Sequence, residues 1–343
     1  MTVQPLRVVF LLEGTGLFGG VKVVLSQANL LQRRGHEVTV ISREAMPGWL
    51  PVEARFRKDP ELDPSAFPEA DVVVATYWTT LGPALAAPSG QPVHYCQGLE
   101  YTYTHNQDQH TAILEAYRHP IPALCVAPHL VEELAQRFGR SGRVALQPLE
   151  SFMKPLGRLR PHRRPRVLVV GPFEIDWKGA ATALEAVRLL RGEGFDFRLV
   201  RISQWPQTAE ERAIFEAEEF HHHLKPRAVA ELMQQCDLLI APSWEQEGFG
   251  LPVLEAMACG VPVVCSDIAP YQWFAAGAAR LVGERKPAAF AAAARAVLED
   301  ADQWRRMRHA GLGRAAEFSA ARGAQSIEDG LRWVVEGSWR SPS

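Results

Sequence analysis

The sequence predicts an α/β protein made of two Rossmann-like domains. Short apolar runs rich in β-branched residues alternate with longer amphipathic segments, which is typical of βαβ units around a parallel sheet. This alternation runs twice along the 343 residues, a length that suits two separate cores. Between about 140 and 165 it is interrupted by four prolines and many cations, which indicates a linker between the domains.

In the first half, five apolar runs are predicted to be parallel strands. They cover residues 6–12, 37–42, 71–76, 92–96 and 123–127. A helix is expected over about 20–34, because apolar residues from Val24 to Leu31 share one face. Gly35 suits the position just beyond the end of this helix.

The second half repeats the pattern. Its strands are expected at 166–171, 196–202, 237–243, 261–266 and 279–283. After residue 285 the sequence is rich in alanine and is predicted to be helical to about 337. Trp333 and Trp339 near its end indicate a helix that packs onto another part of the protein.

Composition excludes several classes of function. The net charge of -2 predicts no nucleic-acid partner. Five cysteines without a C-x-x-C pair argue against both a disulfide framework and a zinc site, and they fit a reducing compartment. The N-terminal apolar run is too short for a signal peptide, and no apolar stretch is long enough for a membrane span. We therefore expect a cytoplasmic protein.

A glycine cluster follows the first predicted strand. Gly14, Gly16 and Gly19 form a G-x-G-x-x-G pattern at the start of a helix, where backbone N–H groups can meet a diphosphate. Taken alone, this loop favours an NAD(P)-dependent oxidoreductase. The acidic residue expected after the second strand is less well placed, because Glu44 arrives only after Arg43.

A second glycine-rich entrance lies after the strand predicted at 237–243. Pro252 suits the first position of a helix and Gly260 suits the position after its end, so a short helix is expected over 252–259. Gly248 and Gly250 leave the start of this helix free of side chains. A phosphate could therefore reach its backbone N–H groups.

Two carboxylates flank this entrance, and a lysine begins a separate helix. Glu247 and Glu255 are suited to accept hydrogen bonds from vicinal sugar or ribose hydroxyls. An acid in the first helical turn also has a structural explanation, whereas Glu247, between glycines, has none. Lys178 begins another helix, where a cation opposes the helix dipole unless an anion binds there.

These motifs resemble the retaining glycosyltransferases of family 4. Glu247 and Glu255 match the E-x7-E motif of that family, within EGFGLPVLEAMACGVPVV. The glycine loop at 14–20 and the segment RGHEVTV are similar to the family's first half. Gln97 and Glu100, in HYCQGLE, resemble a Q-x-x-E segment of members that build bacterial polysaccharides.

The resemblance implies a GT-B fold, with two Rossmann-like domains facing each other across a cleft and C-terminal helices crossing back to the first domain. It implies an acceptor-side domain at 1–155, a donor domain at 156–320, and a helix at 321–343 that packs on the first domain. The implied donor-binding residues are Gly16, Gly19, Gly20, Lys178, Arg201, Glu247, Gly248, Phe249, Gly250, Leu251 and Glu255. Glu247, Lys178 and Gln97 would be catalytic, with Gln97 and Glu100 on the acceptor side.

One departure from the family concerns the pyrophosphate. Members usually pair the lysine with an arginine a few residues earlier, but the segment from Gly171 to Lys178 contains none. Arg201, at the end of the next strand, is the candidate substitute. Relatives can also place a histidine where this chain has Gln97, which cannot act as a general base.

The implied activity is sugar transfer, with retention, from a UDP, GDP or dTDP sugar to a hydroxyl acceptor that is a glycan or lipid-linked. No metal or other cofactor is expected, and His221–His223 is interpreted as structural. Contact with a membrane from the cytoplasmic side is also expected. Three alternatives stay open: the oxidoreductase, a sugar-nucleotide epimerase, and a GT-B protein that binds nucleotide sugars with weak catalysis.

Overall fold

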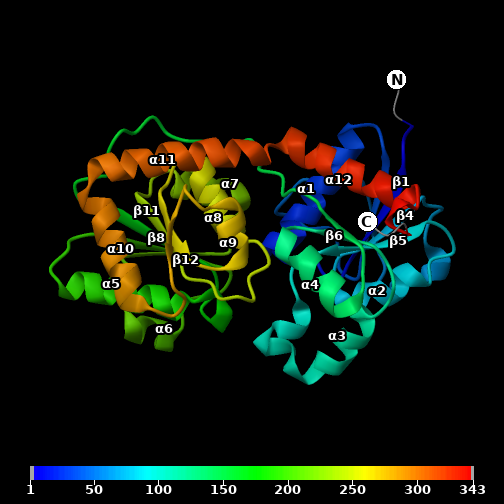
Figure 1. Ribbon diagram of the computed structural model, residues 1–343, viewed down its shortest axis with the longest axis horizontal. Helices are drawn as coiled ribbons and strands as arrows, with labels where there is room; N and C mark the ends of the chain where they lie inside the picture. The colour runs from blue at the N-terminus through cyan, green and yellow to red at the C-terminus, as the bar shows by residue number, and fades with distance from the viewer. Residues whose placement is uncertain (1–3, 341–343) are drawn as a thin grey trace. The chain divides into compact units, whose positions relative to one another are not determined.

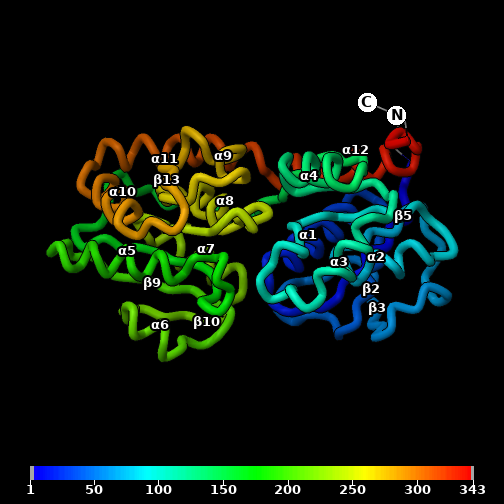
Figure 2. The backbone as a smooth tube through the Cα atoms, turned by 60° about the horizontal axis from the view of Figure 1, so that its bottom comes forward, coloured from blue at the N-terminus to red at the C-terminus, as the bar shows by residue number. Residues whose placement is uncertain are grey.

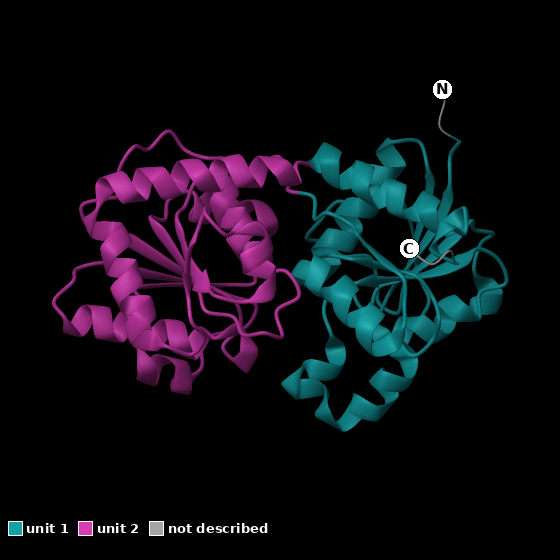
Figure 3. Ribbon diagram, viewed as in Figure 1, with its two compact units in different colours: residues 1–148, 320–343 teal, residues 149–319 magenta. Residues whose placement is uncertain are grey.

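The computed structural model describes residues 4–340, which form two compact units. Unit 1 runs through Pro148 and resumes at Ala320, and unit 2 is Leu149–Ser319 (Figure 3). Within the described range, unit 1 has a seven-stranded sheet and unit 2 a six-stranded sheet, and all paired strands are parallel. The predicted class, a pair of Rossmann-like sheets, is confirmed.

The sheet of unit 1 has the order β3-β2-β1-β4-β5-β6-β7. Its strands are β1 (Arg7–Leu12), β2 (Glu37–Ser42), β3 (Arg55–Lys58), β4 (Val72–Ala75), β5 (Gln91–Cys96), β6 (Ala123–Cys125) and β7 (Gly142–Val144). Its α-helices are α1 (Gly19–Arg33), α2 (Trp78–Leu85), α3 (His110–Tyr117), α4 (Pro128–Phe138) and α12 (Ala320–Val335). Short 3-10 turns are η1 (Pro64–Ala66), η2 (Glu100–Thr102), η3 (Thr104–Gln109) and η6 (Ser338–Arg340).

The last long helix, α12, completes unit 1. It packs against α1 and contacts β4, β5 and β7 (Figure 1). Arg34 beside α1 donates to the Glu328 carboxylate of α12 at 2.7 Å. Trp333 is buried, with the Arg143 guanidinium 4.9 Å from its ring centroid. The expected return of a C-terminal helix to the first domain is confirmed.

The sheet of unit 2 has the order β10-β9-β8-β11-β12-β13. Its strands are β8 (Arg166–Val170), β9 (Arg198–Ser203), β10 (Glu219–His222), β11 (Leu238–Ala241), β12 (Val263–Ser266) and β13 (Arg280–Val282). Its helices are α5 (Ala180–Gly192), α6 (Ala209–Ile214), α7 (Pro226–Met233), α8 (Leu251–Ala258), α9 (Ala269–Phe274), α10 (Pro287–Glu299) and α11 (Ala301–Ala315), with 3-10 turns η4 (Asp176–Lys178) and η5 (Ala316–Phe318).

Helices cover the sheet of unit 2 on both faces, which explains why its central strands β8, β11 and β12 are mostly apolar. Alternate residues of each strand point to opposite faces. Val167 and Ile240 belong to the core that α5 and α10 close, together with Phe290 and Trp304. On the other face, α8 contacts β11 and β12 and packs against α11. The buried strands hold the loops at their carboxyl ends in place.

Candidate active site

Two of the residues predicted to bind the donor, Lys178 and Glu247, lie at the switch point of the sheet of unit 2. β8 and β11 are neighbours, but the chain leaves β8 toward β9 on one side and β11 toward β12 on the other. The loops that follow these two strands therefore diverge, and ligands of doubly wound folds bind at such a place. Lys178 follows β8, and Glu247 follows β11.

Lys178 and Glu247, which are 69 positions apart in the sequence, form an ion pair. Lys178 Nζ lies 2.7 Å from Glu247 Oε2, and it also lies 4.3 Å from the ring centroid of Trp177. The Lys178 side chain is 25% exposed, whereas that of Glu247 is 7% exposed. The lysine therefore remains accessible, and the carboxylate compensates its charge.

Backbone contacts fix the two loops to each other. The N–H of Trp244 donates to the Trp177 carbonyl at 2.8 Å, and the N–H of Glu247 donates to the Trp244 carbonyl at 2.9 Å. Gly179 is left-handed, with φ of 71°, and a Cβ there would lie 2.1 Å from the Pro242 carbonyl oxygen. Only glycine allows this close approach.

Gly250 shapes the entrance to α8. Its φ is 89°, and a Cβ would lie 2.3 Å from the ring of Tyr271. The Tyr271 hydroxyl donates to Ser243 Oγ at 3.3 Å. Burial, with a further effect of the Glu247 charge, raises the pKa of Tyr271 well above its ordinary value. A ring held this way braces the start of α8, which has no side-chain cap.

Most other residues of the E-x7-E segment are buried, whereas Leu251 and Pro252, which begin α8, are half-buried. Phe249 stacks on Phe274 with ring centroids 4.6 Å apart, so only its backbone faces the loop. Glu255 is 6% exposed and lies in α8, one turn before Cys259. Burial, aided by the Glu255 charge, raises the pKa of the Cys259 thiol to about 12.

Arg201 does not lie where the sequence predicted it, and this expectation is corrected. Its side chain is 0% exposed, and its Nε lies 2.8 Å from Glu211 Oε1. Its Nη1 donates to the carbonyls of Ile202 at 2.9 Å and Val169 at 3.3 Å. The guanidinium therefore braces β8 and β9 from inside the fold and has no exposed surface for a pyrophosphate.

The glycine loop of unit 1 is filled by a carboxylate. The N–H of Thr15 donates to Glu44 Oε2 at 2.7 Å, and a Cβ on Gly14 would lie 3.2 Å from the same oxygen. Thr15 Oγ1 also donates to the Ala45 carbonyl at 2.8 Å. A negative charge at this turn repels a dinucleotide diphosphate, so the geometry disfavours the oxidoreductase alternative.

Gly16 lies in the same loop, and Gly19 and Gly20 begin α1. A Cβ on Gly16 would lie 2.9 Å from the Phe18 ring, and one on Gly20 would lie 3.2 Å from Gln97 Nε2. The half-buried Gln97 side chain thus lies over the first turn of α1. The absence of a side chain at Gly20 makes room for it.

Glu100 lies in the interior of unit 1. It is 3% exposed, and its carboxylate accepts a hydrogen bond from the Tyr117 hydroxyl. Asn106 Nδ2 donates to the Glu100 carbonyl at 3.0 Å. Burial raises the pKa of Glu100 to about 7, against the smaller lowering effect of Tyr117. Glu100 therefore holds the loop after Gln97 and has almost no exposed surface of its own.

The histidine run contributes to a strand that the sequence did not predict, between α6 and α7. His221 and His222 lie in β10, an edge strand of the sheet of unit 2 (Figure 2). Across residues 4–340, no group of three or more His, Cys, Asp or Glu side chains is arranged to hold a metal ion. In the same range, no helix combines the length and the apolar character that a membrane crossing requires.

Sequence reasoning missed three aromatic parts of the site. Trp177 lies under the Lys178 ammonium, Tyr271 fills the space that Gly250 leaves, and the backbone N–H of Trp244 links the two loops. The sequence could have indicated the role of Trp177, because this residue precedes Lys178 and cations pair well with indole rings. Tyr271 comes from a separate helix, and no local pattern connects it to Gly250.

Comparison with known proteins finds similarity to a glycosyltransferase family within unit 2. Residues 164–300 match the family described as glycosyl transferases group 1. A curated D-inositol 3-phosphate glycosyltransferase from Nocardia farcinica (strain IFM 10152) is 30% identical over 193 residues, which are 56% of this chain and 42% of the relative. The chain spans less than half the length of the curated relatives that it matches.

Two solved structures have the same fold over almost the whole chain. Sucrose-phosphate synthase from Thermosynechococcus elongatus has a TM-score of 0.79 at 17% identity, covering 96% of this chain and 100% of that one. An Anabaena protein, HepE, was solved in complex with UDP-glucose. It has a TM-score of 0.78 at 14% identity, and the match covers 95% of this chain and 99% of that one. The chain is therefore similar to the glycosyl transferases group 1 over residues 164–300, which lie in unit 2, and it has the GT-B fold of these solved structures.

Proposed function

We propose that the protein is a glycosyltransferase that binds a nucleoside diphosphate sugar at the carboxyl ends of β8 and β11. The observation that carries the proposal is the Lys178–Glu247 pair beside the uncapped start of α8. Lys178 and the backbone N–H groups of α8 offer positive charge to a diphosphate. Glu247 offers oxygens that accept hydrogen bonds from sugar hydroxyls.

In the proposed reaction, the bond between the anomeric carbon and the β-phosphate oxygen breaks. The acceptor hydroxyl oxygen bonds to the same carbon, and its proton passes to a phosphate oxygen of the departing nucleoside diphosphate. Negative charge grows on that phosphate as the bond breaks, so Lys178 stabilises the transition state more than the bound donor. Glu255, in the second turn of α8, is proposed to hold the ribose.

We expect the anomeric configuration to be retained. Glu247 is paired with the lysine that would hold the leaving phosphate, so we propose that its carboxylate lies on the leaving-group side of the sugar. A carboxylate nucleophile would have to attack from the opposite side. We therefore propose that the acceptor attacks from the leaving-group side, which preserves the configuration.

On the acceptor side, we propose Gln97 as the side chain that contacts the substrate. Gln97 is half-buried and lies over Gly20 at the start of α1, whereas the Glu100 carboxylate is already held by Tyr117. The Gln97 amide can position a hydroxyl by accepting or donating a hydrogen bond. The acceptor is proposed to be a hydroxyl of a glycan or of a lipid-linked glycan.

The first test measures thermal stabilisation by UDP, GDP and dTDP, because a ligand that binds the folded state raises its stability. One nucleotide should stabilise the protein clearly more than the others. Lys178→Met should weaken its binding at least about tenfold, since a charge-assisted contact to phosphate is lost. Lys58→Met, an exposed lysine of β3, is the matched control and should change nothing.

Glu247→Gln separates sugar recognition from diphosphate recognition. We expect the nucleoside diphosphate to bind at least as tightly as to the wild type, because Lys178 loses its competing carboxylate. Turnover with the matching nucleotide sugar should fall by about 10² or more, since an interaction made in the transition state is removed. Binding of no nucleotide, or NMR of a product with inverted configuration, would contradict the proposal.

A further inference from the structure

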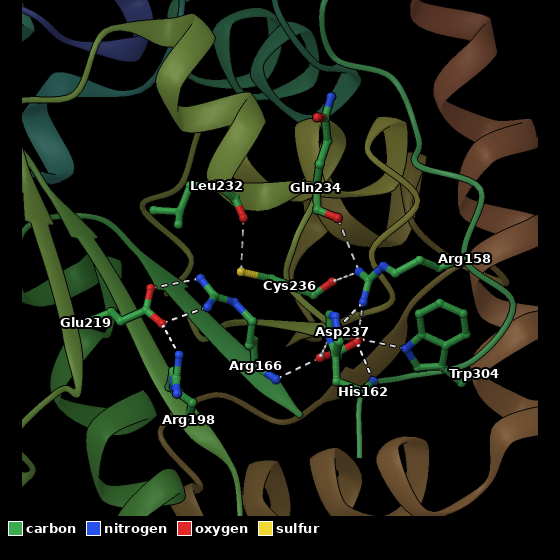
Figure 4. A network of polar contacts seen from close by, with 10 residues as sticks. All are labelled: Arg158, His162, Arg166, Arg198, Glu219, Leu232, Gln234, Cys236, Asp237 and Trp304. Atoms are coloured by element: carbon green, nitrogen blue, oxygen red, sulfur yellow. Dashed lines mark hydrogen bonds and ion pairs between the residues drawn. The ribbon is translucent and has the colours of Figure 1, made fainter. Parts of the chain in front are cut away.

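The segment that leads from unit 1 into β8 is anchored to the start of β11 by one buried carboxylate. Asp237 is 0% exposed, and its Oδ1 accepts from Arg158 Nη1 at 2.6 Å and from the N–H of His162 at 3.1 Å. Its Oδ2 accepts from the N–H of Arg166 at 2.7 Å and lies 2.8 Å from His162 Nδ1 (Figure 4). These contacts fix the path of residues 158–166.

The preceding residues are fixed as well. Gln234 Nε2 donates to the Lys154 carbonyl at 2.9 Å, and the Arg308 guanidinium of α11 donates to the Leu156 carbonyl. Arg158 also lies near the Trp304 ring, at 6.0 Å from its centroid. Prolines at 155, 161 and 165 limit the backbone further. The segment is therefore a firmly held loop, although it lacks secondary structure.

Five side chains of this anchored segment are exposed, and we call them the linker patch: Lys154, Leu156, Leu159, Arg160 and Arg163. Leu156 is 43% exposed and Leu159 is 75% exposed, both large values for leucine. The three cations are exposed, and none has an ion-pair partner among the residues that the structure describes.

Neighbouring arginines differ from those of the patch because their charges are compensated. Arg164 pairs with Asp196 at 2.9 Å, and Arg166 pairs with Glu219 at 2.7 Å. The uncompensated positive charge therefore gathers on Lys154, Arg160 and Arg163, with the two leucines between them in the sequence. Cations alone would suit any polyanion, but exposed leucines gain free energy only where they leave water.

We propose that the linker patch docks on the surface of an anionic lipid bilayer. The two leucines would enter the boundary between headgroups and acyl chains, while the cations would meet phosphate and carboxylate groups of the lipids. Asp237 precedes β11 and Ser243 follows it, so the patch and the Lys178–Glu247 pair lie at opposite edges of one sheet. Docking therefore leaves the donor site open and does not depend on transfer activity.

Vesicle co-sedimentation of the full chain tests the proposal. Vesicles of phosphatidylcholine alone are compared with vesicles that also contain phosphatidylserine, at low and at high salt. The protein should bind the anionic vesicles, and added salt should weaken binding because it screens the cations. Arg160→Gln with Arg163→Gln should lower the partition coefficient by about 30-fold, or about fivefold per cation.

Two further variants of the protein, one at the leucines and one as a control, complete the vesicle experiment. Leu156→Ser with Leu159→Ser should also weaken binding to vesicles, but it should leave binding to heparin, a soluble polyanion, unchanged. The control variant, Arg55→Gln with Lys58→Gln, removes two exposed cations of β3. It should change neither the binding to vesicles nor the binding to heparin. Thermal melting checks that every variant is folded. Equal binding to neutral and anionic vesicles, no binding to either, or leucine variants that bind like the wild type would each overturn the proposal.

Discussion

Glu100 is a carboxyl group that the fold of unit 1 keeps away from water. Its pKa rises from an ordinary value of 4.5 to about 7 because of burial, so the folded state holds a proton that the unfolded chain has lost. Stability therefore falls as the pH rises from about 4.5 to about 7, by about 1.4 kcal/mol per pH unit, and then levels off.

Glu100→Gln should remove this dependence. The amide oxygen can still accept the hydrogen bond of Tyr117, and it never carries a charge. Above pH 7 the variant should be more stable than the wild type by up to about 3 kcal/mol, and below about pH 4.5 the two should agree. Denaturant unfolding across this range measures the difference. A constant difference at every pH would show that folding does not raise the pKa of Glu100.

Single residues of the donor site differ in how far the sequence could predict them. Lys178 and Glu247 stand in loops where no local benefit explains their charge, and the structure brings them together at 2.7 Å. That they compensate each other could not be predicted, because the contact joins two loops from separate strands. Arg201 was predicted wrongly, since a strand-end arginine can turn inward when a partner such as Glu211 is buried beside it.

At the scale of elements, Gly250 decides how α8 begins. Gly250→Ala adds a Cβ at a φ of 89° and within 2.3 Å of the Tyr271 ring. Gly277→Ala is the matched control, because its φ is 78° but no atom lies within 4 Å of the added Cβ. Both variants strain the backbone, but only Gly250→Ala should displace the ring and α8.

We expect Gly250→Ala to be less stable than Gly277→Ala by about 1–3 kcal/mol, the usual cost of forcing an extra group into a packed site. Its affinity for the stabilising nucleoside diphosphate should also fall, because the N–H groups of α8 move. Urea unfolding and nucleotide titration measure both effects. If the two variants behave alike, Tyr271 does not constrain the entrance.

The central strands and α1 were predicted closely because buried strands have continuous apolar runs and α1 has a clear apolar face. Three strands were missed: β3 (RFRK), β7 (GRV) and β10 (EFHH). β3, β7 and β10 each lie at an edge of their sheet, with one neighbour and a polar sequence. Each of these strands forms because it pairs with an adjacent strand, and a local sequence pattern does not predict such a pairing.

At the scale of the whole molecule, the attachment of α12 to unit 1 depends on Gly323. A Cβ there would lie 2.8 Å from Pro148 Cβ and 2.9 Å from its Cα, so the helix or the backbone at Pro148 must shift. Gly323→Ala should lower stability by about 1–3 kcal/mol. Gly313→Ala, in α11 with open space around the added Cβ, should instead gain about 0.5–1 kcal/mol.

Chemical unfolding of both variants gives the comparison. Since Gly323 lies in unit 1 and the proposed donor site lies in unit 2, Gly323→Ala should leave nucleotide binding close to the wild-type value. A stabilising Gly323→Ala substitution would mean that α12 does not approach Pro148 so closely.

The position of α12 also affects the order in which a ribosome can complete the fold. Unit 2 is continuous in sequence, whereas unit 1 needs residues that are translated after unit 2 has ended. During synthesis, α1, β4 and β5 must wait for α12, and the apolar surface that it covers stays open. Unit 1 is thus the first unit to be synthesised but the last to complete its fold. Aggregation of the nascent chain should begin there.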